Sequence, residues 1–139
     1  MERAVPFRYE GDTFWLLDQR KLPFEEVWVP CRTAAEAAAG IRDMVVRGAP
    51  AIGVTAAYGM VLAHLSGEDP AEADRVLRQS RPTAVNLFYA LDRMKPHWGR
   101  LEATLSEARA VWDEVEQTEQ AISRHGAAVL KGQVLTHCN

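Results

Sequence analysis

Cysteine is scarce in this chain. Its 139 residues include only two cysteines, Cys31 and Cys138, which lie far apart and form no CxxC motif. This scarcity excludes a disulfide framework and argues against a thiolate zinc site. One disulfide between the two stays open as an alternative, but free thiols in a reducing cytosol are the simpler interpretation.

The chain also has no excess of basic over acidic residues. Sixteen Lys and Arg against 19 Asp and Glu give a net charge of -3, so no bulk attraction to nucleic acid or to an anionic membrane is expected. The first six residues lack the apolar core of a signal peptide. The longest uncharged stretch, 48–64, is shorter than the ~20 apolar residues of a membrane helix. These absences predict a cytoplasmic protein without nucleic-acid or membrane partners.

Three short β-prone segments open the chain. Residues 5–10 and 13–18 flank Gly11-Asp12, a two-residue turn that is typical of a hairpin. Residues 27–29 form the third segment, bounded by prolines. The pattern predicts a small antiparallel sheet over residues 5–30, which must pack against helices to be stable.

Helical periodicity covers most of the remaining sequence. Thr33 and Glu36 form a capping-box pattern. The helix that follows should bury Ala37, Ile41, Met44 and Val45 and end at Gly48. Four more helices are predicted: Pro50 to about Leu65, Asp69-Pro70 to near Ser80, a Thr83 cap to Pro96 with Val85, Phe88, Leu91 and Met94 inward, and Arg100 to about Leu130. The predicted fold class is α+β, a small antiparallel sheet followed by a helical bundle.

The end of the sequence predicts the beginning of a second domain. Gly132 breaks the last helix, and residues 133–138 have the composition of a β-strand. A strand after a helix ordinarily pairs with other strands, and none follows before Asn139. We therefore expect residues 1–131 to form one domain and residues 132–139 to begin another, which this chain lacks.

Two arginines each precede a predicted helix start. Arg47 comes before Gly48, Ala49 and a proline that suits a first helical turn. Free backbone N–H groups and the positive end of the helix dipole make such a start a natural anion site, and arginine adds a charged fork. Arg81 repeats the arrangement ahead of Thr83. Two such sites converging would suit one phosphate dianion, although each alone is more often a surface arginine beside an ordinary helix start.

Cys138 lies at the end of the predicted last strand. Ligands of parallel α/β sheets bind beyond the carboxyl ends of strands, where a thiol can be acidified by a following helix. A lone cysteine is more often a buried structural residue, so its position leaves both interpretations open. His137 should point to the opposite face of the strand, which argues against a Cys–His dyad. The other histidines have no metal-binding spacing.

Four segments resemble those of the methylthioribose-1-phosphate isomerases, in the same order. They are Ile41–Gly59, which contains the Arg-Gly-Ala-Pro sequence, Arg81–Leu87, Leu17–Pro23 and Leu135–Asn139. Together they span almost the whole chain. Four ordered segments make a much more specific match than any single motif.

The resemblance implies a Rossmann-like C-terminal domain and an active site between the two domains. It implies that Arg47, Gly48, Ala49 and Arg81 bind substrate and that Cys138 is catalytic. The implied reaction is the aldose–ketose isomerisation of 5-methylthioribose 1-phosphate in methionine salvage, by a homodimer with no metal or organic cofactor. The family's catalytic aspartate has no counterpart here, so we expect the 139 residues alone to be inactive without the C-terminal domain.

Related proteins suggest alternative functions for the chain. A ribose-1,5-bisphosphate isomerase would need further positive charge for a second phosphate, which this half does not visibly provide. A regulatory protein similar to translation initiation factor 2B subunits would share the fold without catalysis. The complete Arg47–Pro50 segment together with Cys138 argues against it. A third alternative is that the chain acts only as an oligomerisation module.

Overall fold

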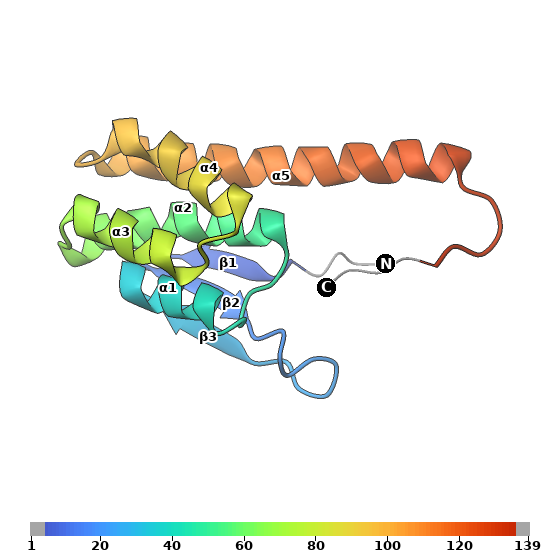
Figure 1. Ribbon diagram of the computed structural model, residues 1–139, viewed down its shortest axis with the longest axis horizontal. Helices are drawn as coiled ribbons and strands as arrows, with labels where there is room; N and C mark the ends of the chain where they lie inside the picture. The colour runs from blue at the N-terminus through green and yellow to red at the C-terminus, as the bar shows by residue number, and fades with distance from the viewer. Residues whose placement is uncertain (1–4, 136–139) are drawn as a thin grey trace.

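A computed structural model describes residues 5–135 of the chain (Figure 1). Its first part is the predicted antiparallel sheet. Strands β1 (Phe7–Glu10), β2 (Thr13–Leu17) and β3 (Trp28–Cys31) lie in the order β1-β2-β3, each pair antiparallel. The turn between β1 and β2 contains Gly11 with φ +63°, a conformation that glycine adopts without strain.

The two faces of the sheet differ in polarity, as the two-residue period of a strand requires. Phe7 pairs with Leu16, and Phe14 pairs with Cys31; all four side chains are buried. On the other face Arg8 pairs with Trp15, and its guanidinium also lies 4.3 Å from the centre of the Trp28 ring. The inner face therefore belongs to the core, as the hairpin prediction requires.

Five α-helices and one 3-10 turn follow the sheet. They are α1 (Ala34–Arg42), α2 (Ala49–Ser66), α3 (Pro70–Ser80), α4 (Val85–Met94), the 3-10 turn η1 (Lys95–His97) and α5 (Leu101–Val129). In Figure 1, α2 runs through the middle of the molecule, between the sheet and the pair α4 and α5. Helix α2 has the length and hydropathy of a membrane span, but 67% of that stretch is buried within the domain. It is the core helix.

Helix α1 is shorter than its sequence predicts. Its Thr33 cap is confirmed, since the hydroxyl oxygen accepts from the backbone N–H of Glu36 at 3.1 Å. The helix ends at Arg42, however, and not at Gly48. Met44 has φ +58° and a 41% exposed side chain, so its predicted place in the core is wrong. The physical reason is that the backbone N–H of Val46 bonds the carbonyl of Gly40, which turns the chain out of the helix.

Helix α4 begins later than predicted and presents a different face. Its N-cap is Ala84 and no side chain caps it, so the prediction of a Thr83 cap is wrong. Val85 is 77% exposed, whereas Leu91 and Met94 are buried as predicted. The buried set is Leu87, Ala90, Leu91 and Met94, while Phe88 is only partly buried. The packing of α4 against α2 selects this face over the one that includes Val85.

Helix α5 confirms the long amphipathic helix but packs along only part of its length. Ala108 is buried and Trp112 partly buried, whereas Ile122 and Val129 are 66% and 74% exposed. Figure 1 shows the distal half of α5 extending past the other helices. Residues 133–135 are in no strand, and the rest of the predicted strand lies outside the described residues. The proposed second domain therefore stays a prediction.

An aromatic cluster joins the sheet to α2 and α5. The ring of Tyr58 stacks on Phe14 with centroids 4.7 Å apart, and Trp112 meets Phe7 edge-on at 4.7 Å. Burial raises the pKa of Tyr58 to about 12, so its hydroxyl stays neutral. Such ring pairs add to the free energy of area burial. They fix α2 between the sheet and α5.

Gly53 sets the closest approach of α2 to α4. A Cβ atom added there would lie 3.0 Å from the carbonyl oxygen of Asn86, whereas one added at Gly126 in α5 would meet nothing nearer than 3.9 Å. We expect Gly53→Ala to lower the free energy of unfolding by roughly 1–3 kcal/mol. Gly126→Ala should raise it by up to about 1 kcal/mol through helix propensity. Urea unfolding followed by circular dichroism measures both, and a Gly53→Ala variant as stable as Gly126→Ala would contradict this packing.

Candidate functional site

The start of α2 carries the first predicted anion site. Gly48 is the N-cap with φ +92°, and no side chain caps the helix there. The first internal bond of the helix runs from the Ile52 N–H to the Gly48 carbonyl at 3.0 Å. The preceding N–H groups of Ala49 and Ala51 point out of the helix end, as in any α-helix. Arg47 is exposed and has no ion pair among residues 5–135.

The start of α4 repeats this arrangement. Arg81 follows the last residue of α3 and is partly buried, and its carbonyl accepts from the Ala84 N–H at 3.1 Å. No side chain caps α4. Helices α1 and α3, in contrast, are capped by Thr33 and Asp69. The starts of α2 and α4 therefore both lack a side-chain cap and both follow an arginine in sequence. Helix α5 also lacks a side-chain cap, but it starts at the other end of the domain.

The structure brings these two helix starts together. Helices α2 and α4 lie side by side and run in the same direction, so both N-termini lie at the same end of the domain (Figure 1). Their direct contact is the close approach of Gly53 to the backbone of Asn86. Asn86 is in the first turn of α4. The two arginines consequently belong to neighbouring helix ends, although they come from segments more than thirty residues apart in sequence.

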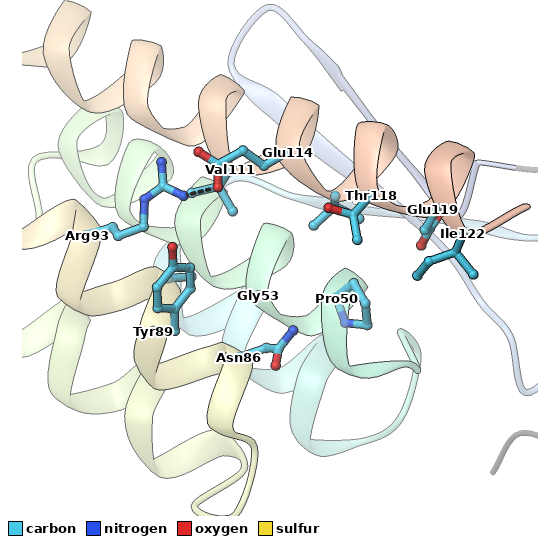
Figure 2. A pocket seen from close by; sticks show the side chains of 12 residues that line it. Pro50, Gly53, Asn86, Tyr89, Arg93, Val111, Glu114, Thr118, Glu119 and Ile122 are labelled. Atoms are coloured by element: carbon cyan, nitrogen blue, oxygen red, sulfur yellow. Dashed lines mark hydrogen bonds and ion pairs between the residues drawn. The ribbon is translucent and has the colours of Figure 1, made fainter. Parts of the chain in front are cut away.

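Two cavities flank the start of α2. One, of about 210 Å³, is lined by Arg47, Gly48, Pro50 and Ala51 on one side and by β1 and α5 on the other; Arg81 lies outside it. The second, of about 260 Å³, lies between α2, α4 and α5 (Figure 2). Both cavities share Pro50 of α2 with Val115 and Glu119 of α5. The distal half of α5 thus forms a common wall.

The second cavity has polar residues that the sequence analysis did not single out. Asn86, Tyr89 and Arg93 line it from α4, and Glu114 and Thr118 line it from α5 (Figure 2). Their spacings of three or four residues place each set on one helix face. A polar stripe at this spacing on two adjacent predicted helices was the signal that could have found them.

Arg93 is not available to bind an anion. Its guanidinium pairs with Glu107 at 2.6 Å and with Glu114 at 2.5 Å, and it lies over the Tyr89 ring. The hydrogen bond to Glu114 is the main cause of its raised pKa. Two carboxylates already satisfy this side chain. We interpret Arg93 as a brace between α4 and α5.

The charges around the first cavity favour one of its walls. Glu116 and Glu119 line the α5 side, and Glu116 accepts from the Trp112 indole N–H at 3.0 Å. A phosphate near these carboxylates would be repelled. The opposite wall, with Arg47 and the N–H groups at Gly48 and Ala49, is the favourable side for an anion.

Of the two cysteines, only Cys31 lies within the described residues. Cys138, the predicted catalytic residue, lies outside the described residues. Cys31 is 1% exposed, and burial raises its pKa to about 12. Cys31 is therefore an inert core thiol at neutral pH. Among residues 5–135, no group of three His, Cys, Asp or Glu side chains could hold a metal ion.

The curated relatives that match this chain include methylthioribose-1-phosphate isomerases. The chain is 72% identical over 141 aligned residues to the methylthioribose-1-phosphate isomerase of Thermus thermophilus, and 45% identical over 137 to that of Aquifex aeolicus. The alignments cover 100% and 96% of this chain but only 43% and 30% of those proteins. The chain therefore spans less than half the length of the curated relatives it matches.

Two solved structures align with this chain and point to the same group of proteins. The 5-methylthioribose 1-phosphate isomerase of Pyrococcus horikoshii aligns with a TM-score of 0.84 at 33% identity, over the whole of this chain and 47% of that one. The delta subunit of translation initiation factor eIF-2B from A. fulgidus aligns with a TM-score of 0.67 at 34% identity, over 78% of this chain and 36% of that one. The model of the initiation factor 2 subunit family matches residues 45–139, well over half of the sequence. The chain belongs to the initiation factor 2 subunit family.

Proposed function

We propose that this protein supplies the phosphate-binding part of an aldose–ketose isomerase acting on 5-methylthioribose 1-phosphate. One observation carries the proposal: two uncapped helix starts, each beside an arginine, lie at the same end of the domain. The chain that contains them is 72% identical to a protein named for this reaction. A sugar phosphate offers the dianion that such helix starts bind.

The reaction needs an acid, and then a hydrogen transfer between neighbouring carbons. The phosphate on C1 prevents spontaneous opening of the ring, so an acid must protonate the ring oxygen as the C1–O bond breaks. A hydrogen then moves from C2 to C1, as a proton or as a hydride, while the C2 hydroxyl loses its proton and becomes the ketone. We propose Cys138 as one acid/base group. The second lies in sequence that this chain does not contain.

Phosphate binding would fix the substrate for this transfer. In the proposal, the N–H groups at Gly48 and Ala49 and the guanidinium groups of Arg47 and Arg81 hold the dianion. Helix N–H groups and arginine forks make charge-assisted hydrogen bonds, which orient as well as bind. Because the phosphate is bonded to C1, holding it also places C1 and C2.

Two other functions remain candidates. A ribose-1,5-bisphosphate isomerase needs a second cationic site, but Arg93 is already paired and Glu116 and Glu119 line the nearer cavity. The similarity to the eIF-2B delta subunit is the observation that speaks for a non-catalytic regulatory protein. The Pyrococcus horikoshii isomerase aligns over more of the chain and with a higher TM-score, which supports the enzyme.

We also propose that the assembled protein is a cytoplasmic homodimer that works in methionine salvage. The acidic composition and the scarcity of cysteine are consistent with the cytoplasm. Ile122, Val129 and Leu130 expose apolar surface along and just after α5, which a second subunit or a further domain would cover.

The first prediction concerns the 139 residues alone. They should convert no methylthioribose 1-phosphate, because only one of the two acid/base groups is present. A chimera in which they replace the matching segment of the Thermus thermophilus protein should be active. Product formation measured by NMR tests both proteins, and turnover by the 139 residues alone would contradict the proposed division of the site.

A second prediction separates the two cysteines. In the chimera, Cys138→Ala should lower kcat by at least about 100-fold, which is typical for loss of a general acid or base. Its melting temperature should stay within about 2 °C of the parent, since replacing a residue that acts chemically and not in packing is expected to alter stability by less than about 0.5 kcal/mol. Cys31→Ala should show the reverse, with a lower melting temperature and nearly normal kcat. Near-normal turnover of Cys138→Ala would remove it from the mechanism.

A third prediction is that Arg47 and Arg81 bind one phosphate. Each Arg→Ala change should weaken substrate binding about ten- to a hundred-fold, since charge-assisted hydrogen bonds contribute roughly 1.5–3 kcal/mol. Arg→Lys should recover only part of this because the fork is lost. Arg75, exposed on α3 and paired with Glu72, is the matched control, and Arg75→Ala should change binding by less than about twofold.

The double variant tests whether the target is shared. The losses from Arg47→Ala and Arg81→Ala should be coupled, because both act on one dianion. The dephosphorylated sugar 5-methylthioribose should bind equally to all variants. Additive losses, together with equal sensitivity for the dephosphorylated sugar, would mean that the arginines do not meet on one phosphate.

A further inference from the structure

The loop that carries Arg47 is held from outside its own helices. This loop, residues 43–48, joins α1 to α2 and contains the left-handed Met44. The backbone N–H of Gln19, just after β2, donates to the carbonyl of Val45 at 3.0 Å. Val45 and Val46 are both buried, while Arg47 is exposed. The loop is thus fixed at its middle by the segment that follows β2.

One ion pair, between the residues on either side of Gln19, shapes that segment. The guanidinium of Arg20 donates to both oxygens of Asp18, at 2.8 and 2.7 Å, and the Arg20 backbone N–H donates to Asp18 as well, at 3.1 Å. Asp18 is 3% exposed, and its own N–H donates to the Val27 carbonyl at 2.8 Å. These bonds fold residues 18–20 into a tight turn with the Gln19 N–H directed at the loop.

Arg20 also reaches the loop directly. Its remaining terminal nitrogen, Nη1, donates to the carbonyl of Asp43 at 3.4 Å. The hydrogen bond from Arg20 is the main cause of the lowered pKa of Asp18, so the pair stays ionised at neutral pH. Asp43 and Val45 are consequently tied to the same turn, and Val45 lies two residues before Arg47 and three before the Gly48 N-cap.

We propose that Asp18 and Arg20 are positioning residues that set the conformation of the loop 43–48 and so aim Arg47 and the Gly48–Ala49 N–H groups at the phosphate. This inference rests on the proposed function for the identity of the anion. Arg20 touches no residue of the anion site; it acts through the carbonyls of Asp43 and, by way of Gln19, Val45. Arginine suits this task because its planar fork binds both carboxylate oxygens and keeps a donor for the backbone.

A purely stabilising role would look different. The Arg20 side chain is 48% exposed, whereas that of Asp18 is 4% exposed. Removing Arg20 leaves a buried carboxylate without its partner, so some global stability is lost. A positioning role adds a local effect, because the loop then loosens by more than the helical core does. The local and global effects can be measured separately.

The chain offers a matched control in Arg42. Its guanidinium also pairs with an aspartate, Asp43, at 2.9 and 3.3 Å, and it is more exposed than Arg20. Both arginines thus bond the same residue, but Arg42 bonds only the side chain of its neighbour in sequence. Arg42 makes no hydrogen bond to the segment after β2 among the described residues. Arg42→Lys and Arg42→Ala isolate the effect of losing an arginine–aspartate pair.

The first measurement is amide hydrogen exchange in the 139-residue protein, for Arg20→Lys, Arg20→Ala, Asp18→Asn and the Arg42 controls. Exchange over residues 43–49 should become at least about tenfold faster in both Arg20 variants, and by a larger factor than exchange in α2, which reports the loss of global stability. The Arg42 controls should exchange as the wild type does. If Asp18→Asn fails to fold, the surface variant Arg20→Ala still decides. Unchanged loop exchange in Arg20→Ala overturns the proposal.

The second measurement is an NMR titration with inorganic phosphate, followed at the Gly48 and Ala49 amides. Arg20→Ala should raise the Kd about five- to tenfold at a temperature where both proteins stay folded, and Arg20→Lys should lie between Arg20→Ala and wild type. Equal Kd values in wild type and Arg20→Ala overturn the positioning role. A wild type with no response at either amide, but with loop exchange that depends on Arg20, counts against the proposed phosphate site and supports the control of loop conformation by Arg20.

Discussion

The architecture depends on the burial of one helix, α2, on every side. Twelve of its 18 residues are buried, and a helix that is apolar all round is stable only when other elements cover it. The sheet covers one side, α1 and α3 another, and α4 and α5 the rest. The small residues of α2 permit this, because Gly53 meets the backbone of α4 and Gly59 meets Leu77 of α3. Each neighbour is therefore located by its contact with α2.

That constraint also places the candidate site. A fully covered helix can meet solvent only at its ends, and the N-terminal end of α2 is where Gly48 leaves the backbone N–H groups without a side-chain cap. The close packing of α4 brings a second uncapped start to the same end. The core thus determines which polar groups come together, and the proposed isomerase chemistry uses the result.

Much of this could be predicted from sequence because the signals are local. Short-range physics explains the Gly11-Asp12 turn, the Thr33 and Asp69 helix caps, and the helical spacing of apolar residues along α5. The predictions were wrong where contacts between residues distant in sequence determine the local structure. The turn after α1, in which the Val46 N–H bonds the Gly40 carbonyl, is also held by the Gln19 N–H at the Val45 carbonyl. The exposure of Val85 depends on which face of α4 meets Gly53. The polar groups of the second cavity were missed for the same reason, since their meeting requires the pairing of α4 with α5. The roles of Arg47, Arg81 and Cys138 remain predictions.

The overhang of α5 has a consequence for how this sequence can vary. At 29 residues the helix is about 43 Å long, and the half that carries Ile122 and Val129 buries little against its own domain. Substitutions there have little effect on whether the domain folds. The proximal half, by contrast, includes Ala108 and Val111, which are fully packed in the core. The domain's own packing therefore constrains the first half of this continuous helix, whereas the second half is constrained only by whatever further surface it meets.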